Sequence, residues 1–301
     1  MMSEGKKTIG FIGIGAMGKP MSLNLVKAGY PLIAYDINTK PLEELKELGA
    51  SVGRSTKDVA SQTDVIITML PNSPDVEEVI LGQNGVMEGI KRDSIVIDMS
   101  TIDPSVSRRI SETLLTKSIK MLDAPVSGGP EGAEAGTLSI MVGGDEQIFH
   151  KCEEIFKGMG KNIFYCGPNG NGAIVKSVNN LLAGTMAVIN AEALALGVKA
   201  GVDFKVLFDI ISVSTGRSVF LKNAAPMKAF KGDFEPGFMA NLMHKDLGIA
   251  VNLAREQGVP IPVGALSHQI FSQFKASGVG IKDWTITVKQ YEDLLGIKLR
   301  F

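Results

Sequence analysis

Short apolar runs rich in β-branched residues alternate with helical patterns through the first half of the chain. This pattern predicts strands at residues 8–14, 31–35, 65–70, 94–99, 119–122, 139–142 and 163–165. Helices are expected between them, for example at residues 15–27 and 40–48, where Gly29 and Gly49 supply stop signals. Strands that alternate with helices are typical of βαβ units, so we expect an α/β fold with a doubly wound, mostly parallel sheet.

The pattern changes after residue 168. From Ala173 onward the sequence is almost continuously helical, and residues 202–301 show no strand-like alternation. We therefore predict two domains, an α/β domain at residues 1–168 and an all-α domain at residues 169–301. A long helix at about residues 173–200 is expected to join them.

One apolar segment, residues 181–201, is long enough to suggest a membrane span. Asn190 and Glu192 interrupt it and Lys199 follows, which favours a helix buried inside protein. We expect no membrane association.

Composition excludes several classes of function. With 31 Lys and Arg against 32 Asp and Glu, the net charge of −1 argues against a nucleic-acid partner. The two cysteines and three scattered histidines form no metal-binding motif, so we expect no metal. Free thiols, with no secretion signal at the N-terminus, indicate a cytoplasmic protein. Glycine is unusually abundant, at 34 of 301 residues, against about 7% in ordinary proteins.

Three of these glycines form a GxGxxG loop between the first predicted strand and the helix that follows it. In this context the motif predicts a Rossmann domain that binds a dinucleotide. Gly13 permits a tight turn, Gly15 lets the backbone approach a pyrophosphate, and Gly18 allows the helix to pack on the strand. The predicted cofactor-binding loop comprises Gly13, Ile14, Gly15, Ala16, Met17 and Gly18.

Asp36 ends the second predicted strand, 18 residues after Gly18. A carboxylate there accepts both ribose hydroxyls of NAD and repels the 2′-phosphate of NADP. Two observations leave the choice open. Asp36 could instead cap the following turn, and Lys40 could partly neutralise a phosphate. NAD is the expected cofactor, with NADP as the alternative.

Further cofactor contacts are expected at the carboxyl ends of later strands, where ligands of such sheets bind. Leu70 and Pro71 end the strand at 65–70, and Thr101 follows the strand at 94–99. Without a ligand these would be ordinary turn residues.

Two other segments carry candidate substrate chemistry. The loop at residues 123–130 contains Ser127, Gly128 and Gly129, whose N–H groups and hydroxyl could hold a carboxylate. Lys176 and Asn180 lie four residues apart, on one face of the predicted long helix and among apolar neighbours. Burial would lower the pKa of the lysine and suit it to proton transfer. The alternative is a lysine whose stem extends to water.

Four blocks in this order resemble the β-hydroxyacid dehydrogenase family over nearly the whole chain. They are GFIGIGAMGKPM at 10–21, DAPVSGGPEGAEAGTLSIMVGG at 123–144, GNGAIVKSVNN at 170–180 and HKDLGIA at 244–250. The resemblance implies a Rossmann domain, a long interdomain helix, a helical second domain and assembly into homodimers or homotetramers. It also implies an NAD(P)-dependent enzyme that interconverts 3-hydroxy acids and semialdehydes, with a small carboxylate as substrate.

By the same resemblance, Lys176 matches the catalytic lysine and Asn180 its partner at the substrate. Ser127, Gly128 and Gly129 match the loop that binds the substrate carboxylate. Thr101 matches a cofactor contact, Lys245 a lysine that closes over the nicotinamide, and Asp246 a substrate-site residue that follows it.

Details within the family point to several substrates. The GKPM and PVSGGPEGAEAGTLSIMVGG blocks resemble 2-hydroxy-3-oxopropionate (tartronate semialdehyde) reductases, which we favour. Residues 214–217 and 242–247 are closer to 3-hydroxyisobutyrate dehydrogenases. Sulfolactaldehyde and succinic semialdehyde are further alternatives, and Arg217 could contact substrate or cap a helix. A non-catalytic dinucleotide-binding protein is the alternative of another class, although it would be expected to lose Lys176.

Overall fold

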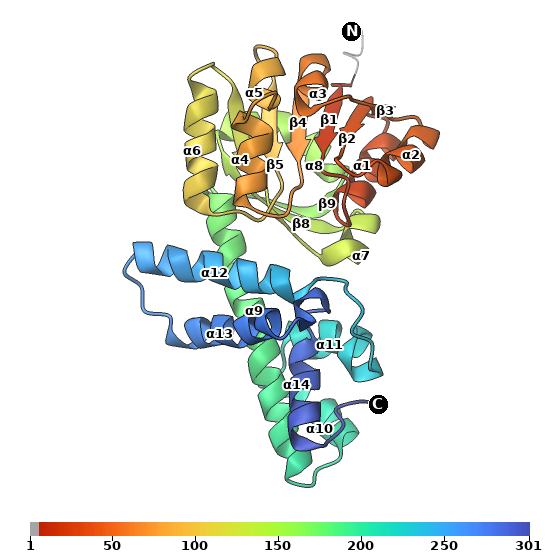
Figure 1. Ribbon diagram of the computed structural model, residues 1–301, viewed down its shortest axis with the longest axis vertical. Helices are drawn as coiled ribbons and strands as arrows, with labels where there is room; N and C mark the ends of the chain where they lie inside the picture. The colour runs from red at the N-terminus through yellow and green to blue at the C-terminus, as the bar shows by residue number, and fades with distance from the viewer. Residues whose placement is uncertain (1–5) are drawn as a thin grey trace. The chain divides into compact units, whose positions relative to one another are not determined.

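The computed structural model describes residues 6–301, which form two compact units (Figure 1). The first ends at Lys176, and the second comprises Ser177–Phe301. The division falls inside helix α9 (Asn171–Lys199), a few residues beyond the domain boundary predicted between 168 and 169. The first turn of α9 belongs to the first unit because it is hydrogen-bonded to the end of a strand of that unit.

The first unit contains a nine-stranded sheet that is mostly parallel, as predicted. Its strand order is β3-β2-β1-β4-β5-β6-β8-β7, with β9 paired to β8; the pairs of β8 with β6 and β7 are antiparallel. The run β3-β2-β1-β4-β5-β6 is the order of a dinucleotide-binding Rossmann sheet. The strands are β1 (Ile9–Ile12), β2 (Leu32–Tyr35), β3 (Ser51–Val52), β4 (Val65–Thr68), β5 (Ile95–Asp98), β6 (Lys120–Asp123), β7 (Val126–Ser127), β8 (Leu138–Gly144) and β9 (Gly160–Tyr165).

Helices cover both faces of this sheet because successive strand residues point to opposite sides. Phe11 belongs to a core with helices α1, α2 and α8, whereas Ile12 belongs to a core with α3, α4, α5 and α6. All four residues of β1, β4 and β5 are buried, as expected for central parallel strands. The helices are α1 (Gly18–Lys27), α2 (Lys40–Glu47), α3 (Thr56–Gln62), α4 (Ser73–Leu81), α5 (Val86–Gly89), α6 (Pro104–Leu115), α7 (Gly129–Glu134) and α8 (Glu146–Lys157).

The second unit is helical, as predicted, and β-structure in it is limited to the single bridge between Met239 and Asp283. Small residues of α9, such as Ala187 and Ala191, are buried in a core with Phe220 and Phe271. Besides α9, its helices are α10 (Phe204–Ile211), α11 (Ala225–Met227), α12 (Ala240–Glu256), α13 (Pro262–Ala276) and α14 (Ile286–Leu295), with a π turn at Phe220–Ala224 and 3-10 turns at Ala229–Lys231 and Val279–Ile281.

Helix α9 is the one helix among residues 6–301 that is long and apolar enough to cross a membrane, by length and composition alone. One side of it is part of the core of the second unit, as the sequence led us to expect. The other side is not buried. Leu182, Ile189 and Leu196 are exposed along it, so the expectation of a helix buried all round is wrong for this face.

Candidate active site

The glycine loop between β1 and α1 has the conformation that a dinucleotide site requires. Gly13 has a φ of +96°, and a Cβ at this position would collide with the carbonyl oxygen of Met69. A Cβ at Gly18 would collide with the carbonyl of Gly13, so helix and strand pack as closely as predicted. A Cβ at Gly15 would meet nothing within 4 Å, which leaves this side of the loop open for a pyrophosphate. These residues therefore fit NAD(P).

Asp36 performs two tasks at the end of β2. Its Oδ2 accepts a hydrogen bond from the N–H of Ile14 at 2.6 Å, and its Oδ1 accepts one from the N–H of Asn38 at 2.7 Å. Asp36 thus caps the turn after β2, which was one of the two interpretations, and also holds the glycine loop. The remaining lone pairs of the carboxylate can still accept ribose hydroxyls.

The predicted contacts after β4 and β5 are held together by hydrogen bonds. The N–H of Leu70 donates to Ser100 Oγ at 2.9 Å, which links the two strand ends. Pro71 and Thr101 each lie one residue further along their turns. The structure thus brings these residues to the carboxyl edge of the sheet, beside the glycine loop after β1.

Ser127 ends β7, and Gly128 and Gly129 begin α7. Both glycines have a positive φ, +139° and +65°, which residues with side chains rarely adopt. Gly128 occupies the N-cap position, and no side chain caps the first N–H groups of α7. This is the backbone geometry expected for a loop that binds a carboxylate.

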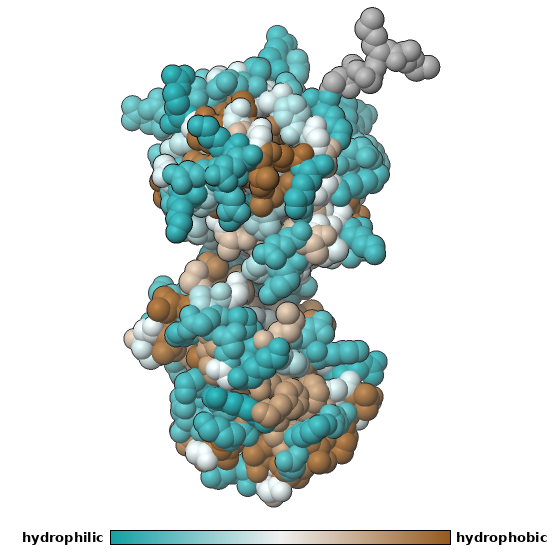
Figure 2. Space-filling model, turned by 90° about the vertical axis from the view of Figure 1, so that its right-hand side faces the viewer, coloured by the Kyte–Doolittle hydropathy of each residue, from teal (hydrophilic) through white to brown (hydrophobic). Residues whose placement is uncertain are grey.

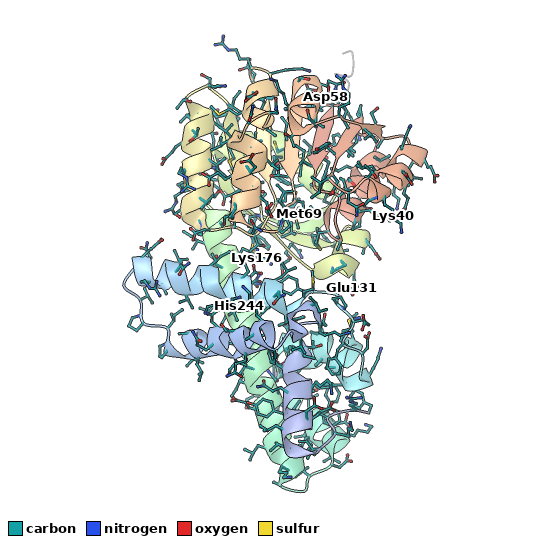
Figure 3. All side chains as sticks on the ribbon, viewed as in Figure 1. Lys40, Asp58, Met69, Glu131, Lys176 and His244 are labelled. Carbon is teal, nitrogen blue, oxygen red and sulfur yellow. The ribbon has the colours of Figure 1, made fainter. Side chains whose placement is uncertain are left out.

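Lys176 is the sixth residue of α9 and lies below its beginning in Figure 3. Its side chain is only 9% exposed, which contradicts the alternative of a stem extending into water. The next residue, Ser177, and Asn180 are also buried, whereas Val175 and Val178 are 41% and 50% exposed. The first turns of α9 therefore bury polar side chains and expose apolar ones, the reverse of an ordinary surface helix.

Asn180 and the two other predicted residues of the second unit form one cluster. Asn180 Nδ2 donates to Asp246 Oδ2 at 2.6 Å, and Asp246 Oδ1 pairs with Lys245 Nζ at 3.1 Å. Asp246 is 3% exposed and Asn180 5%. The cluster thus joins α9 to the first turns of α12 and fixes the orientation of the Asn180 amide.

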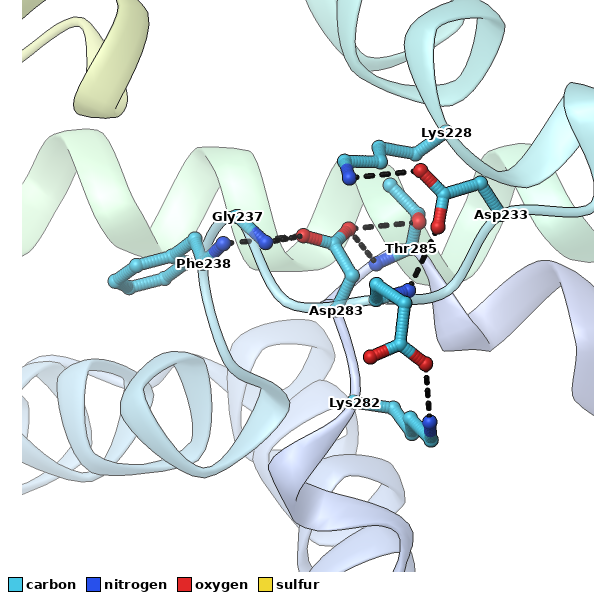
Figure 4. Close-up of polar contacts among 8 residues, drawn as sticks. Lys228, Asp233, Gly237, Phe238, Lys282, Asp283 and Thr285 are labelled. Atoms are coloured by element: carbon cyan, nitrogen blue, oxygen red, sulfur yellow. Dashed lines mark hydrogen bonds and ion pairs between the residues drawn. The ribbon is translucent and has the colours of Figure 1, made fainter. Parts of the chain in front are cut away.

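The beginning of α12 is anchored by Asp283, which sequence reasoning missed (Figure 4). Its Oδ2 accepts hydrogen bonds from the N–H groups of Gly237 and Phe238, both at 3.0 Å. Its Oδ1 accepts from the N–H and hydroxyl of Thr285, at 3.0 and 2.7 Å. The carboxylate is 2% exposed, so it binds the segment that leads into α12 away from water. The residues around Asp283 carry no signal of these contacts, because Gly237 and Phe238 lie 46 and 45 residues away in the sequence.

Two family models match most of the chain. Residues 8–167 match the family model for the NAD-binding domain of 6-phosphogluconate dehydrogenase. Residues 170–291 match the model described as NAD-binding of NADP-dependent 3-hydroxyisobutyrate dehydrogenase.

The chain is 41% identical over 291 residues to 2-(hydroxymethyl)glutarate dehydrogenase of Eubacterium barkeri, with 97% of each chain covered. It is 41% identical over 292 residues to mitochondrial 3-hydroxyisobutyrate dehydrogenase of Mus musculus, covering 95% of this chain and 87% of the relative. A solved structure of Mycobacterium tuberculosis 3-hydroxyisobutyrate dehydrogenase with L-serine superposes with a TM-score of 0.86 at 32% identity. That comparison covers 95% of this chain and 99% of the other. The chain therefore belongs to the β-hydroxyacid dehydrogenase family and is an NAD(P)-dependent dehydrogenase of hydroxy acids.

Proposed function

We propose that this protein interconverts glycerate and 2-hydroxy-3-oxopropionate (tartronate semialdehyde), with NAD as the preferred cofactor. The main support for the reaction type is that Lys176 is buried and lies in the same unit as a glycine loop suited to a carboxylate. The substrate choice rests on the sequence blocks at 10–21 and 123–144. The NAD preference rests on the carboxylate of Asp36 at the end of β2.

In the proposed mechanism, the substrate carboxylate accepts hydrogen bonds from Ser127 and from the N–H groups of the Gly128–Gly129 turn. Lys176 takes the proton of the C3 hydroxyl during oxidation and returns it during reduction. Asn180, one helical turn after Lys176, orients the reacting oxygen. A bound NAD(P) supplies the acceptor or donor of the hydride. The residues of this chain bind the substrate, orient it and move its proton.

A second candidate substrate is 3-hydroxyisobutyrate, which is favoured by the 41% identity to the mouse enzyme. Glycerate, 3-hydroxyisobutyrate, L-serine and 2-(hydroxymethyl)glutarate are all 3-hydroxypropanoates that differ in the group on C2. The proposed carboxylate loop and Lys176 would contact only the carboxylate and the C3 hydroxyl, which these molecules share. The choice among them therefore depends on what surrounds C2.

The test is a comparison of kcat/KM for glycerate, 3-hydroxyisobutyrate, L-serine and 2-(hydroxymethyl)glutarate with NAD and with NADP, followed as NAD(P)H absorbance. Sulfolactaldehyde and succinic semialdehyde complete the panel in the reducing direction. The proposal expects the highest kcat/KM for glycerate with NAD. A tenfold preference for 3-hydroxyisobutyrate would overturn the substrate assignment, and no turnover of any compound would favour a non-catalytic binding protein.

We also propose that the protein assembles into a homodimer or homotetramer. Val175, Leu182, Ile189 and Leu196 recur at intervals of seven along α9, and all are more than 40% exposed. Figure 2 shows hydrophobic surface, in brown, among the polar residues of the second unit. A repeat of seven suits packing against another helix, and a second copy of α9 would supply one. Sedimentation equilibrium of the full chain and of Leu182→Glu tests this, since a monomeric wild type contradicts it.

A cytoplasmic location is proposed from the cysteines. Cys152 is buried, Cys166 is partly buried, and both are free. Burial raises the pKa of the Cys152 thiol to about 11, which disfavours the thiolate form. Fractionation of cells that produce the protein tests the location, and recovery in a membrane or secreted fraction would contradict it.

A further inference from the structure

Asp123 is a buried carboxylate that has no role in the proposed proton transfer or in substrate binding. It ends β6 and is 1% exposed. In the sheet it pairs in register with Asp98 of β5, which in turn pairs with Thr68 of β4. Three polar residues thus occupy equivalent positions at the carboxyl ends of adjacent strands. Burying a carboxylate costs free energy unless it is hydrogen-bonded. The hydrogen-bond partners of Asp123 therefore indicate its role.

The partners of Asp123 are at the beginning of α9. Oδ1 accepts a hydrogen bond from the N–H of Gly170 at 2.7 Å, and Oδ2 accepts one from the N–H of Ala173 at 3.0 Å. These N–H groups belong to the start of the helix, where intrahelical acceptors are lacking. Ala173 precedes Lys176 by three residues, so the lysine lies one turn beyond the anchored residue.

The surroundings are shaped to admit this carboxylate. A Cβ at Gly143 would lie 2.7 Å from Asp123 Oδ1, and one at Gly172 would lie 2.9 Å from Oδ2. Only glycine leaves room at both positions. On the far side of the loop, Arg108 packs against Gly170 and donates to the carbonyl of Asn169 at 3.2 Å. The first turn of α9 is therefore held both by the strand end and by α6.

We propose that Asp123 is the positioning residue for Lys176, fixing the lysine-bearing turn of α9 and placing a negative charge at its N-terminus. This inference rests on the proposed function, in which Lys176 transfers the proton. The negative charge opposes the positive end of the helix dipole, so it favours the protonated form of the lysine. The other ionisable groups that face Asp123 or its partners are Asp98 on β5, Cys166 after β9 and Arg108 on α6.

The test replaces Asp123 by asparagine, which keeps the shape, removes the charge and leaves one of the two N–H groups without its acceptor. Lys176 is observed by NMR of the protein with 13C-labelled lysines, assigned with Lys176→Arg. In Asp123→Asn we expect the pKa of Lys176 to fall by about 0.5 units. We also expect kcat to fall about tenfold, with KM for the cofactor changed less than about twofold. The lysine-dependent limb of the pH profile for oxidation should move to lower pH.

Asp145→Asn is the matched control. Asp145 caps α8 in the same unit by accepting hydrogen bonds from the N–H groups of Gln147 and Ile148. Asparagine keeps this cap through its Oδ1 and removes only the charge, which should leave the pKa of Lys176 and kcat unchanged. A folded Asp123→Asn protein with an unchanged Lys176 pKa and unchanged kcat would overturn the inference.

If Asp123→Asn does not fold, the wild-type protein supplies the test. Burial raises the pKa of Asp123 to about 6, so the Lys176 resonance should show a second inflection near that pH. Its absence would overturn the inference. The NMR readout does not depend on turnover. A failure of the proposed function, seen as full activity of Lys176→Ala, is therefore distinguishable from a failure of this inference.

Discussion

Asn180 donates a hydrogen bond to Asp246 over 2.6 Å, and both side chains are almost fully buried. The other oxygen of Asp246 pairs with Lys245, so one carboxylate holds an amide of α9 and an ammonium of α12. Because the amide is bound through its nitrogen, its direction is set before any substrate arrives.

Asp246→Asn should therefore reduce catalysis while leaving the fold intact. Asparagine can still accept the bond from Asn180 but loses the charge and the pair with Lys245. Weakening this charge-assisted bond by about 1.5 kcal/mol corresponds to a decrease of roughly tenfold in kcat/KM. Asp293→Asn is the control, since it removes an exposed pair with Lys289 on α14. Equal steady-state kinetics for wild type and Asp246→Asn would contradict this role.

Asp36 links cofactor choice to the shape of the glycine loop through its bond to Ile14. Asp36→Asn should raise KM for NAD, because an uncharged amide binds the ribose hydroxyls less well. It should also remove repulsion of a 2′-phosphate. We expect the ratio of kcat/KM for NAD to that for NADP to fall by about tenfold or more. Loosening of the loop would affect both cofactors equally and cancel in this ratio, so an unchanged ratio would disprove the assignment.

Asp283 should be important for stability. Asp283→Ala leaves the N–H groups of Gly237, Phe238 and Thr285 without their acceptor in a buried place. We expect a loss of about 3 kcal/mol or more in the free energy of unfolding, measured with urea. Glu235→Gln is the matched control from the same segment, where Glu235 forms an exposed pair with Lys282. A loss of similar size in both variants would show that the buried carboxylate has no special role.

The raised pKa of the Asp123 carboxyl predicts a pH dependence of stability. Its pKa rises from 3.8 to about 6 in the folded protein, mainly through burial, so the folded chain binds a proton more tightly than the unfolded one. Its contribution is most favourable below about pH 4 and is lost as the pH rises to about 6. Between pH 4 and 7, wild type should lose up to about 3 kcal/mol relative to Asp123→Asn.

Asp145→Asn should show the opposite sign in the same measurement. Burial opposes ionisation of Asp145, but hydrogen bonds from Ile148 and Gln147 and the charge of Lys120 outweigh it and lower its pKa. Wild type should therefore gain stability relative to Asp145→Asn as the pH rises. If the stability of wild type relative to each of the two variants changed with pH in the same direction, a raised pKa at Asp123 would be contradicted.

The order of strands and helices was predictable because central parallel strands are continuous apolar runs. Strands β3 and β7 were missed, since two residues each carry no periodicity. The first helix begins at Gly18 rather than residue 15, because the glycine loop itself occupies the residues before it. The exposed face of α9 was also missed. Leu182 and Ala191 are both apolar, so their residue types do not show that Leu182 is exposed and Ala191 is buried.

Gly13 and Lys176 were proposed from residue type and spacing, whereas Asp246 was proposed only from the family resemblance. Asp123 and Asp283 were not found, because each acts through backbone N–H groups distant in sequence. A carboxylate at the end of a buried strand, as at Asp123, is the one signal that would have indicated such a role.

The most direct test of the central claim is the turnover number of Lys176→Ala with the best substrate of the panel. The mechanism predicts that kcat falls about 10³-fold, because the proton of the C3 hydroxyl loses its acceptor. NADH binding, followed by fluorescence titration of the same sample, should stay within about threefold of wild type, since the glycine loop is untouched. Turnover within tenfold of wild type in a folded Lys176→Ala protein would contradict the account.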